Sequence, residues 1–287
     1  MKLSVVIVNW NTRDLLEKCL GTLAENVCSW PFEVIVVDNQ SKDGSASMVQ
    51  AQFPHFTCIE SGGNLGYAAG NNLGIEHSQG EYILTLNSDT ELAPNVLESA
   101  VNKLESMPKH GAMGVKQIGV DGNVQHSVRG FPSLLGVFGD VTKLGKLIPA
   151  LDSYRQRNFD YSKSQDADQP MGTFLLLRRS ALDDIAINGK PFDLDFPIFF
   201  NEVDLLYRLR KKGWLCHYTA DIEILHHGGE STKQVRKNMI WESHKSLVRY
   251  FSKHLTGMAR ISLPLVAGII YLAALVRARG YHAGFRP

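Results

Sequence analysis

The tripeptide Asn87-Ser88-Asp89 has residue types that suit a site for a metal ion and a phosphate group. It follows an apolar run at 82–86, which predicts that it lies at the end of a buried strand. Hard cations such as Mn²⁺ and Mg²⁺ prefer oxygen ligands and often take only one or two protein carboxylates when phosphates supply the rest. Asp89 is therefore a candidate ligand, and Asn87 could bond a ribose. An ordinary turn is the alternative, because Asn, Ser and Asp are frequent turn formers.

A second acidic segment, Asn201-Glu202-Val203-Asp204, follows an apolar stretch and opens a predicted helix. A carboxylate there lies near the positive end of the helix dipole, and beside a pocket it could act as a general base. Glu202 is the preferred candidate over Asp204, because Asp204 has the spacing to pair with Arg208 one helical turn later. Helix capping is the alternative explanation for both acids.

Two adjacent histidines, His226 and His227, follow an apolar run at 222–225, which predicts a further strand. Imidazole suits Mn²⁺ as well as softer transition metals, so one histidine could complete the coordination begun at Asp89. Paired histidines in a Gly-rich loop can also be plain surface residues. The pair alone therefore predicts a candidate ligand and no more.

Polar residues also follow the earlier apolar runs. Asn9 and Asn11 come after the first run, and Asp38 and Asn39 after the second. Ligands of open parallel sheets bind at the carboxyl ends of the strands. These side chains and the acidic turn are therefore predicted to face one crevice, where Asp38 could accept hydrogen bonds from a base or a ribose. An Asx-rich turn is by itself common in proteins.

The segment 62–72, Gly-Gly-Asn-Leu-Gly-Tyr-Ala-Ala-Gly-Asn-Asn, follows the third apolar run and leads into a predicted helix. Its small residues would let the backbone approach a ligand, or let the helix pack closely on the sheet, and both can hold together. The segment lacks the Gly-Lys-Ser/Thr of a P-loop and the Gly-x-Gly-x-x-Gly of a dinucleotide-binding turn.

A mostly parallel sheet is the scaffold that would bring these positions together. Apolar runs predict strands at 3–8, 32–37, 56–59 and 82–86, and helical periodicity predicts helices at 13–24, 45–52, 67–78 and 94–107. Strands that are apolar on both faces and alternate with helices indicate an α/β fold with helices on both sides of the sheet. From 116 to 168 the pattern loosens, which predicts a variable or mobile stretch. Further strands are predicted at 170–177 and 214–219, and further helices from 180, at 202–212 and at 233–254.

Composition excludes several classes of protein. A chain of 287 residues with 44% hydrophobic positions can bury one large core or two closely joined halves. Its formal net charge of +1 gives no general attraction to nucleic acid, so a bound polyanion must be held by a local site. The four cysteines lie far apart without a CxxC pair, which indicates free thiols in a reducing compartment.

Two apolar segments bear on the question of a membrane. The segment at 1–10 is followed at once by polar residues and has no small-residue cleavage site, which indicates a first buried strand rather than a signal peptide. The segment at 261–276 carries no charge and has basic residues on both sides. It is shorter than the roughly 20 residues of a spanning helix and contains Pro264, so it could span, lie in the interface or pack on the main domain.

Seven stretches of the chain resemble the family 2 glycosyltransferases of the GT-A fold, in particular the rhamnosyltransferase-like branch that builds bacterial surface polysaccharides. They cover most of residues 3 to 231 and are SVVIVNWN, VIVVDNQSKDG, GGNLGYAAGNN, YILTLNSD, MGTFLLLRRSAL, FFNEVDLLYRLRKKGW and ILHHGGES. The expected organisation is a nucleotide-sugar-binding half at 1–115, an acceptor-binding and catalytic half at 116–235, and a C-terminal helix with a membrane-associating segment at 236–287.

The resemblance implies that the nucleotide is bound by Asp38 and by the segment 64–71, which includes Asn64, Gly66 and Asn71. Asn87-Ser88-Asp89 would be this chain's form of the family's Asp-x-Asp motif for metal and diphosphate, with Asn in place of the first Asp.

The resemblance also implies the groups opposite the donor. Glu202 falls where the family has its catalytic Asp, with Asn201 in place of the preceding acid. The extra methylene of Glu shifts the carboxylate, and misplacement on that scale can be costly. His226 matches the metal-binding histidine, and Gly172 and Thr173 match the acceptor-site segment.

The implied activity is inverting transfer of a sugar from a nucleotide-diphosphate donor, with Mn²⁺ or Mg²⁺ as cofactor and dTDP-rhamnose as the donor suggested by the branch. The acceptor would be a glycan or a polyprenyl-linked saccharide at the cytoplasmic face of the membrane. One alternative, a sugar-1-phosphate nucleotidyltransferase, would need a Gly-rich basic loop where this chain has Asn9-Trp10-Asn11-Thr12. The other is a nucleotide-sugar-binding or scaffold protein without turnover, suggested by the Asn201-Glu202 substitution.

Overall fold

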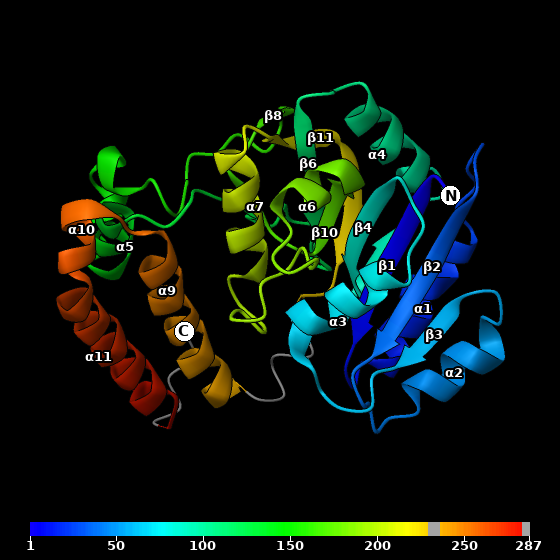
Figure 1. Cartoon of the computed structure of the whole chain (residues 1–287), viewed down its shortest axis with the longest axis horizontal. Coiled ribbons are helices and arrows are strands. Elements are labelled where there is room, and N and C mark those ends of the chain that lie inside the picture. The colour runs from blue at the N-terminus through cyan, green and yellow to red at the C-terminus, as the bar shows by residue number, and fades with distance from the viewer. Residues whose placement is uncertain (229–235, 283–287) are drawn as a thin grey trace.

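The computed structural model describes residues 1–228 and 236–282. Within them, a β-sheet of nine strands carries helices on both faces, and a helical part extends from one end (Figure 1). The strand order is β3-β2-β1-β4-β10-β6-β11-β5, and β8 pairs with β11. Positions 229–231 of the last family-like stretch and 233–235 of the last predicted helix lie outside the described residues.

Four neighbouring strands run parallel, as predicted: β1 (Leu3–Asn9), β2 (Phe32–Asp38), β3 (Thr57–Glu60) and β4 (Tyr82–Asn87). The helices that follow the first three are α1 (Arg13–Ala24), α2 (Ser45–Gln52) and α3 (Gly66–Glu76). The register sets Asn9 beside Asp38 and Val8 beside Asn87. The polar residues that end these strands therefore meet at one edge of the sheet.

Two hydrophobic cores, one on each face, hold the helices to the sheet. Helices α1, α2 and α4 (Val96–Glu105) contribute to one core, and α3, α6 (Arg179–Ile185) and α7 (Asn201–Lys211) to the other. Helix α3 lies so close to β1 that a Cβ on Gly70 would come within 2.8 Å of Val8, and one on Gly74 within 2.3 Å of Val6. These glycines therefore serve close packing of the helix on the sheet.

The remaining strands make the sheet mixed, so the prediction of a mostly parallel sheet is wrong beyond its first four strands. Strand β10 (Phe174–Arg178) runs antiparallel between β4 and β6 (His110–Ile118). Strand β6 is parallel to β11 (Leu215–His226), whose end pairs with β5 (Thr90–Leu92). The strands predicted at 214–219 and 222–225 are one strand, β11, with a register shift against β6 between Thr219 and Glu223.

Strand β6 lies inside the sheet, yet its sequence did not predict it. Gly111 and Gly114 interrupt its apolar pattern, and both are required by packing. A Cβ on Gly111 would lie 2.9 Å from Ala181 Cβ, and one on Gly114 would lie 2.4 Å from Pro170 Cβ. The residues that weaken the strand pattern are thus the ones that let neighbouring segments approach.

The stretch predicted to be variable or mobile contains short elements. They are β7 (Val128–Arg129), α5 (Leu134–Val141), the 3₁₀ turns η1 (Leu144–Lys146) and η2 (Pro149–Leu151), β8 (Gln165–Asp166) and β9 (Gln169–Pro170). Ser133 caps α5 by accepting a 3.0 Å hydrogen bond from the Gly136 N–H. This helix was not predicted.

The chain continues in α9 (Arg236–His254), α10 (Gly257–Ile261) and α11 (Leu263–His282). None of the helices in the described part of the chain is long and apolar enough to cross a membrane. Helix α11 buries Ile270, Ala274 and Ala278, while Leu265 and Val276 are exposed. The four cysteines are free thiols, as predicted.

Candidate active site

A chain of hydrogen bonds joins three strand ends at the edge of the parallel half. Asn9 Nδ2 donates to Asp38 Oδ1 over 3.2 Å, and Asn9 Oδ1 accepts from the Thr12 hydroxyl over 2.6 Å. Since the Thr12 proton is used there, the Ser88 hydroxyl donates to Thr12 Oγ1, 2.9 Å away. All four side chains are buried. The predicted residues Asn9, Asp38 and Ser88 thus belong to one network.

Four other predicted residues shape the loops around this network. Asn11 has a φ of +52°, and its Oδ1 accepts a backbone hydrogen bond of 2.7 Å from the loop after β2. Asn39 Nδ2 donates to the Gly66 carbonyl and Asn64 Oδ1 accepts from the Gly66 N–H, both over 3.1 Å. Gly66 has a φ of +80°, and a Cβ there would come within 2.8 Å of the Pro197 carbonyl oxygen. Only glycine fits this position of the rim.

Asn71 and Asn87 do not form the rim. They make hydrogen bonds to residues of neighbouring turns and segments. Asn71 is fully buried inside α3, and its Nδ2 donates to the Tyr67 carbonyl over 2.9 Å. The Asn87 N–H donates to the Thr173 carbonyl over 2.9 Å, and its carbonyl accepts from the Thr90 hydroxyl over 2.8 Å. The backbone of Asn87 therefore ties the acidic turn to the predicted acceptor segment.

Asp89 and His226 face each other across two paired strands. Strand β5 follows the acidic turn directly and pairs with the end of β11, with Thr90 opposite His226. His226 Nε2 lies 3.5 Å from Asp89 Oδ1, and both side chains are buried. The structure thus brings together the two predicted metal ligands, which are far apart in the sequence.

Gln125, which the sequence did not point to, sets which nitrogen of His226 faces Asp89. Gln125 Nε2 donates to the His226 carbonyl over 3.0 Å, so its Oε1 accepts from His226 Nδ1 over 2.6 Å. With the proton assigned to Nδ1, Nε2 carries a lone pair, and this buried atom has no hydrogen-bond partner among the described residues. Histidine ligands of metals are commonly oriented in this way.

The Asp89 and His226 atoms therefore fit a divalent cation. A lone pair and a carboxylate oxygen 3.5 Å apart attract a cation placed between them. One carboxylate oxygen and one imidazole nitrogen suit Mn²⁺, and phosphate oxygens of a donor would supply further ligands.

Glu202 lies at the start of α7 beside the predicted acceptor segment. A Cβ on Gly172 would lie 3.6 Å from Glu202 Cβ and 3.8 Å from the Tyr67 hydroxyl, and that hydroxyl donates to the Gly172 carbonyl over 3.1 Å. Burial raises the pKa of Glu202, although hydrogen bonds from the N–H groups of Glu202 and Val203 oppose the rise. Burial also raises the pKa of Tyr67, and the charges of Glu202 and Asp89 add to that rise. The charges of both carboxylates thus act on Tyr67, which was not predicted as a site residue.

Asp204 takes part in a buried ionic cluster. Its Oδ2 lies 2.7 Å from Arg208 Nε, as the spacing predicted, and its Oδ1 lies 2.6 Å from Lys253 Nζ and 2.7 Å from His254 Nε2. Burial opposes ionisation, but the hydrogen bond from His254 and the positive charge of Arg208 lower the pKa of Asp204 to about 2. Both oxygens are thus engaged, Oδ2 within α7 and Oδ1 in joining α7 to α9.

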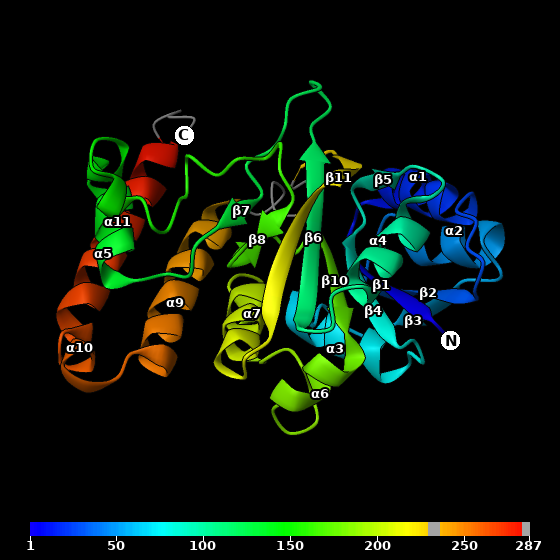
Figure 2. The same ribbon diagram turned by 90° about the horizontal axis from the view of Figure 1, so that it is seen from above.

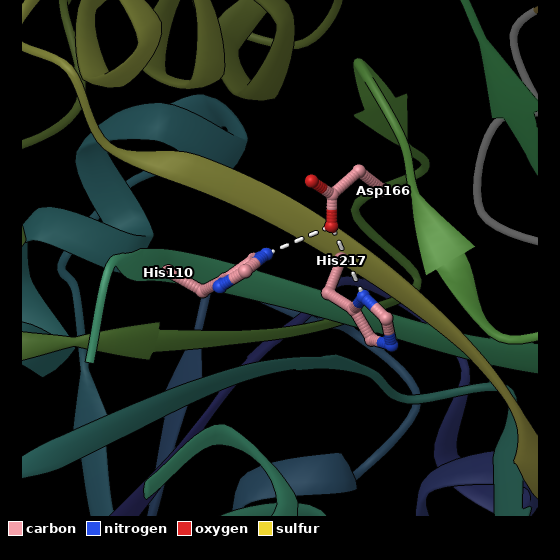
Figure 3. Close-up of side chains that lie close together, drawn as sticks. All are labelled: His110, Asp166 and His217. Atoms are coloured by element: carbon pink, nitrogen blue, oxygen red, sulfur yellow. Dashed lines mark hydrogen bonds and ion pairs between the residues drawn. The ribbon is translucent and has the colours of Figure 1, made fainter. Parts of the chain in front are cut away.

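A separate group of ionisable side chains lies at the opposite end of β6 and β11. Asp166 Oδ1 lies between His110 Nε2, at 2.8 Å, and His217 Nδ1, at 3.3 Å (Figure 3). Burial opposes ionisation, but hydrogen bonds from both histidines lower the pKa of Asp166. The run of β11 from His217 to His226 spans roughly 30 Å at about 3.3 Å per residue. The group therefore ties β8 to the sheet far from the crevice.

Comparison with known sequences gives a consistent result. Residues 4–186 match the family described as Glycosyl transferase family 2. Two Mycobacterium tuberculosis proteins, from strains CDC 1551 / Oshkosh and H37Rv, are each 28% identical over 274 residues, which is 91% of this chain and 87% of theirs. Both are named N-acetylglucosaminyl-diphospho-decaprenol L-rhamnosyltransferase. The O-antigen biosynthesis protein RfbC of Myxococcus xanthus is 26% identical over 81% of this chain and 18% of its own length.

Solved structures share the fold. The crystal structure of S. aureus TarS 1-349 aligns with a TM-score of 0.57 and 17% identity, over 96% of this chain and 81% of that one. The mannosyltransferase PcManGT from Pyrobaculum calidifontis, in complex with GDP-Man and Mn²⁺, aligns with a TM-score of 0.58 and 20% identity, over 100% of this chain and 76% of that one. The α/β fold of this chain is therefore GT-A-like.

Proposed function

This chain belongs to glycosyl transferase family 2 and is a glycosyltransferase, and we propose that it moves a sugar with inversion from a nucleotide-diphosphate donor to a lipid-linked saccharide. The observations that carry the proposal are the approach of His226 to Asp89 and the position of Glu202 beside Gly172, whose carbonyl accepts from Tyr67. Its relatives place the general activity in polysaccharide synthesis.

The donor is proposed to lie along the strand ends of the parallel half. The Asp38 carboxylate and the segment around Gly66 would take the nucleoside, because they lie together at the carboxyl ends of the parallel strands, where Asn39 bonds the Gly66 carbonyl. Rhamnose from dTDP-rhamnose is the proposed donor sugar, since the two mycobacterial relatives are named as L-rhamnosyltransferases.

Asp89 and His226 would hold Mn²⁺ or Mg²⁺. The cation, when bound, supplies positive charge to the diphosphate as it leaves. Gln125 keeps His226 Nε2 unprotonated for that ligand role.

Glu202 is the proposed base. Its carboxylate accepts the proton of the acceptor hydroxyl while that oxygen forms a bond to the anomeric carbon. The bond from that carbon to the phosphate oxygen breaks, and the nucleoside diphosphate leaves from the opposite face with the electron pair. The raised pKa of Glu202 suits this role, because a base works best with a pKa near the operating pH. Asp204 is a poorer candidate, since its two oxygens already contact Arg208, Lys253 and His254.

We further propose that the enzyme works at the cytoplasmic face of a membrane, held peripherally. Helices α10 and α11 expose Met258, Ile261, Leu265 and Leu272, which suits contact with the interfacial region of a bilayer. The relatives' names include a decaprenol-linked acceptor, which agrees with work at a membrane surface.

Measurement of the products tests the proposal. The purified chain should be stabilised against heat by its donor in the presence of Mn²⁺, and it should release nucleoside diphosphate only when a lipid-linked saccharide is added. Pyrophosphate as the product would instead assign a nucleotidyltransferase. Stabilisation by a donor without transfer to any such acceptor would assign a binding protein, the alternative that the Asn201-Glu202 substitution suggests.

A further inference from the structure

A cavity of about 880 Å³ lies outside the crevice, between the α5 segment, which we define as residues 126–157, and helices α9 and α11. Figures 1 and 2 both show α5, α10 and α11 together at the end of the molecule remote from β2 and β3. The cavity has the size of a typical ligand site. None of the residues of the strand-end network lines it.

The lining of the cavity is rich in cations. Arg129, Lys143, Lys146, Arg155, Arg157 and Arg277 line it, against a single lining carboxylate, that of Asp140. Arg155 and Arg157 share this carboxylate at 2.7 and 3.1 Å. The lining therefore has a net excess of positive charge that one or more phosphate groups would balance.

Arg129 is the lining cation that is best placed to take a bound anion. Its side chain is partly buried at the cavity wall, and no ion pair or side-chain hydrogen bond joins its guanidinium to another described residue. Burial, reinforced by the positive charge of Arg155, lowers the pKa of Arg129. Placing a cation there without a partner costs free energy that a bound anion would recover.

Aliphatic side chains also line the cavity. Val137, Leu247, Ile270 and Leu272 contribute to it from α5, α9 and α11. Aliphatic side chains offer no hydrogen bonds to a sugar or to the edge of a nucleotide base. They suit a hydrocarbon chain whose charged end reaches the arginines.

The cavity begins close to the proposed base. Phe200, which lines it, is two residues before Glu202 in the chain. Tyr154 also lines it, burial raises the pKa of Tyr154, and the charge of Glu202 adds to that rise. A saccharide attached to a group in the cavity would thus extend toward the Glu202 carboxylate.

Large apolar side chains are exposed on the outer surface around the cavity. On the α5 segment, Leu135, Phe138 and Leu147 are exposed, and on α11 Leu265 and Val276 are exposed. Val276 and Leu272 belong both to this surface and to the cavity lining. A long hydrocarbon chain leaving the cavity would therefore meet apolar side chains rather than water.

We propose that this cavity binds the isoprenoid diphosphate part of the acceptor, with the phosphates at Arg129 and Arg155 and the first isoprene units against α5, α9 and α11. This inference rests on the proposed transfer to a lipid-linked saccharide. It adds a defined acceptor site to that function, and it explains why cationic and aliphatic side chains line one cavity that reaches Phe200.

Binding of geranylgeranyl diphosphate to the full chain, measured by calorimetry, tests the site without requiring turnover. The wild-type chain should bind this probe at least ten times more tightly than inorganic pyrophosphate or geranylgeraniol, because each of those lacks one half of the match. Arg129→Gln should weaken binding about tenfold, as expected for a lost charge-assisted hydrogen bond. Arg279→Gln is the matched control, since Arg279 is an exposed cation of α11 outside the cavity lining.

Two readouts separate this role from a merely structural one. The melting temperature of Arg129→Gln should be equal to or above that of the wild-type chain, because the change removes a cation without a partner. Its KM for a lipid-linked acceptor should rise about tenfold, whereas Arg279→Gln should keep the KM of the wild-type chain.

Three outcomes would overturn the cavity assignment or separate it from the proposed function. Wild-type affinity of Arg129→Gln for the probe would overturn the assignment. So would Arg129-dependent binding to phosphatidylglycerol vesicles without binding of the diphosphate, which would make the cavity a site for a membrane lipid headgroup. Arg129-dependent binding of the probe by a chain that transfers no sugar would support the cavity and refute the transferase proposal.

Discussion

The proposed donor side and the proposed acceptor side of the site are built in different ways. On the donor side, Asn9, Thr12, Asp38 and Ser88 end or follow consecutive parallel strands and bond to one another directly. On the acceptor side, the helix of Glu202 is held by ion pairs to α9, and the adjoining cavity is enclosed by segments far apart in the sequence. Strand-end chemistry thus follows from the order of strands, while the acceptor side depends on contacts between segments far apart in the sequence.

Asp89→Ala should break the donor side with the largest effect. Loss of the carboxylate should lower turnover by about a thousandfold or more, since metal-ion charge stabilisation is worth several kcal/mol. Stabilisation by donor plus Mn²⁺ should disappear as well, which a thermal shift assay would show. His217→Gln, in the remote histidine group, is the control and should leave both measurements unchanged. Full stabilisation of Asp89→Ala by donor and Mn²⁺ would place the cation elsewhere.

Glu202→Gln should break the acceptor side alone. Turnover should fall by roughly 10² to 10⁴, as for loss of a general base, while donor binding stays intact. The wild-type rate should fall as the pH falls through the Glu202 pKa, which lies above the ordinary 4.5, because the base must be ionised. A pH–rate profile of the variant should lack this step. Full turnover by Glu202→Gln would move the base to another residue.

Asp204→Asn should weaken the joint between α7 and α9. The change leaves Arg208, Lys253 and His254 around a neutral side chain, which should cost about 3 kcal/mol of unfolding free energy in urea titrations. In the wild-type chain the Asp204 pKa falls from 3.8 to about 2, so its contribution is present above pH 4 and is lost as the pH falls from about 4 to about 2. The variant should lack that loss.

Asp160→Asn is the matched control for this acid dependence. The pKa of Asp160 is also about 2, because it accepts hydrogen bonds from Ser162 and Lys163, but it is exposed. Its replacement should change stability little. Equal stability of the Asp204→Asn and wild-type chains would show that the cluster does not hold α7.

Gln125→Leu should have the smallest effect, and it should change only the affinity for the cation. Without the acceptor at Nδ1, His226 is no longer held in the tautomer that presents Nε2 to Asp89. Loss of such an orienting partner typically weakens metal affinity 10- to 100-fold. A titration of activity with Mn²⁺ should shift by that factor and recover at high Mn²⁺. An unchanged titration would contradict the assigned tautomer.

Much of the donor side could be predicted from the sequence. Apolar runs followed by Asn9, Asp38 and Asn87 identify strand ends without knowledge of tertiary contacts, because the carboxyl ends of parallel strands share one edge. From the sequence, the pairing of Asp89 with His226 could be stated only as a hypothesis. It depends on β5 pairing with β11, and a three-residue strand gives little periodicity.

The acceptor side could be predicted less well, for physical reasons. Gly111 and Gly114 interrupt the apolar pattern by which β6 could have been predicted. They are needed because neighbouring segments pack against the backbone of β6 there. Gln125 gains its role only from the tautomer of a residue on another strand. Arg129 has no distinctive local motif, and its isolation emerges only once α5, α9 and α11 enclose it. Contacts of this kind leave no local periodicity.

The Asp204 cluster also bears on which pieces of this protein can be exchanged with those of its relatives. The family match ends at residue 186, before Glu202, Asp204 and His226. Because Lys253 and His254 hold Asp204 two residues beyond Glu202, a hybrid enzyme that keeps the base helix must also keep the chain as far as residue 254. The smallest transplantable acceptor module therefore includes α9, although that helix contributes none of the predicted catalytic or metal-binding residues.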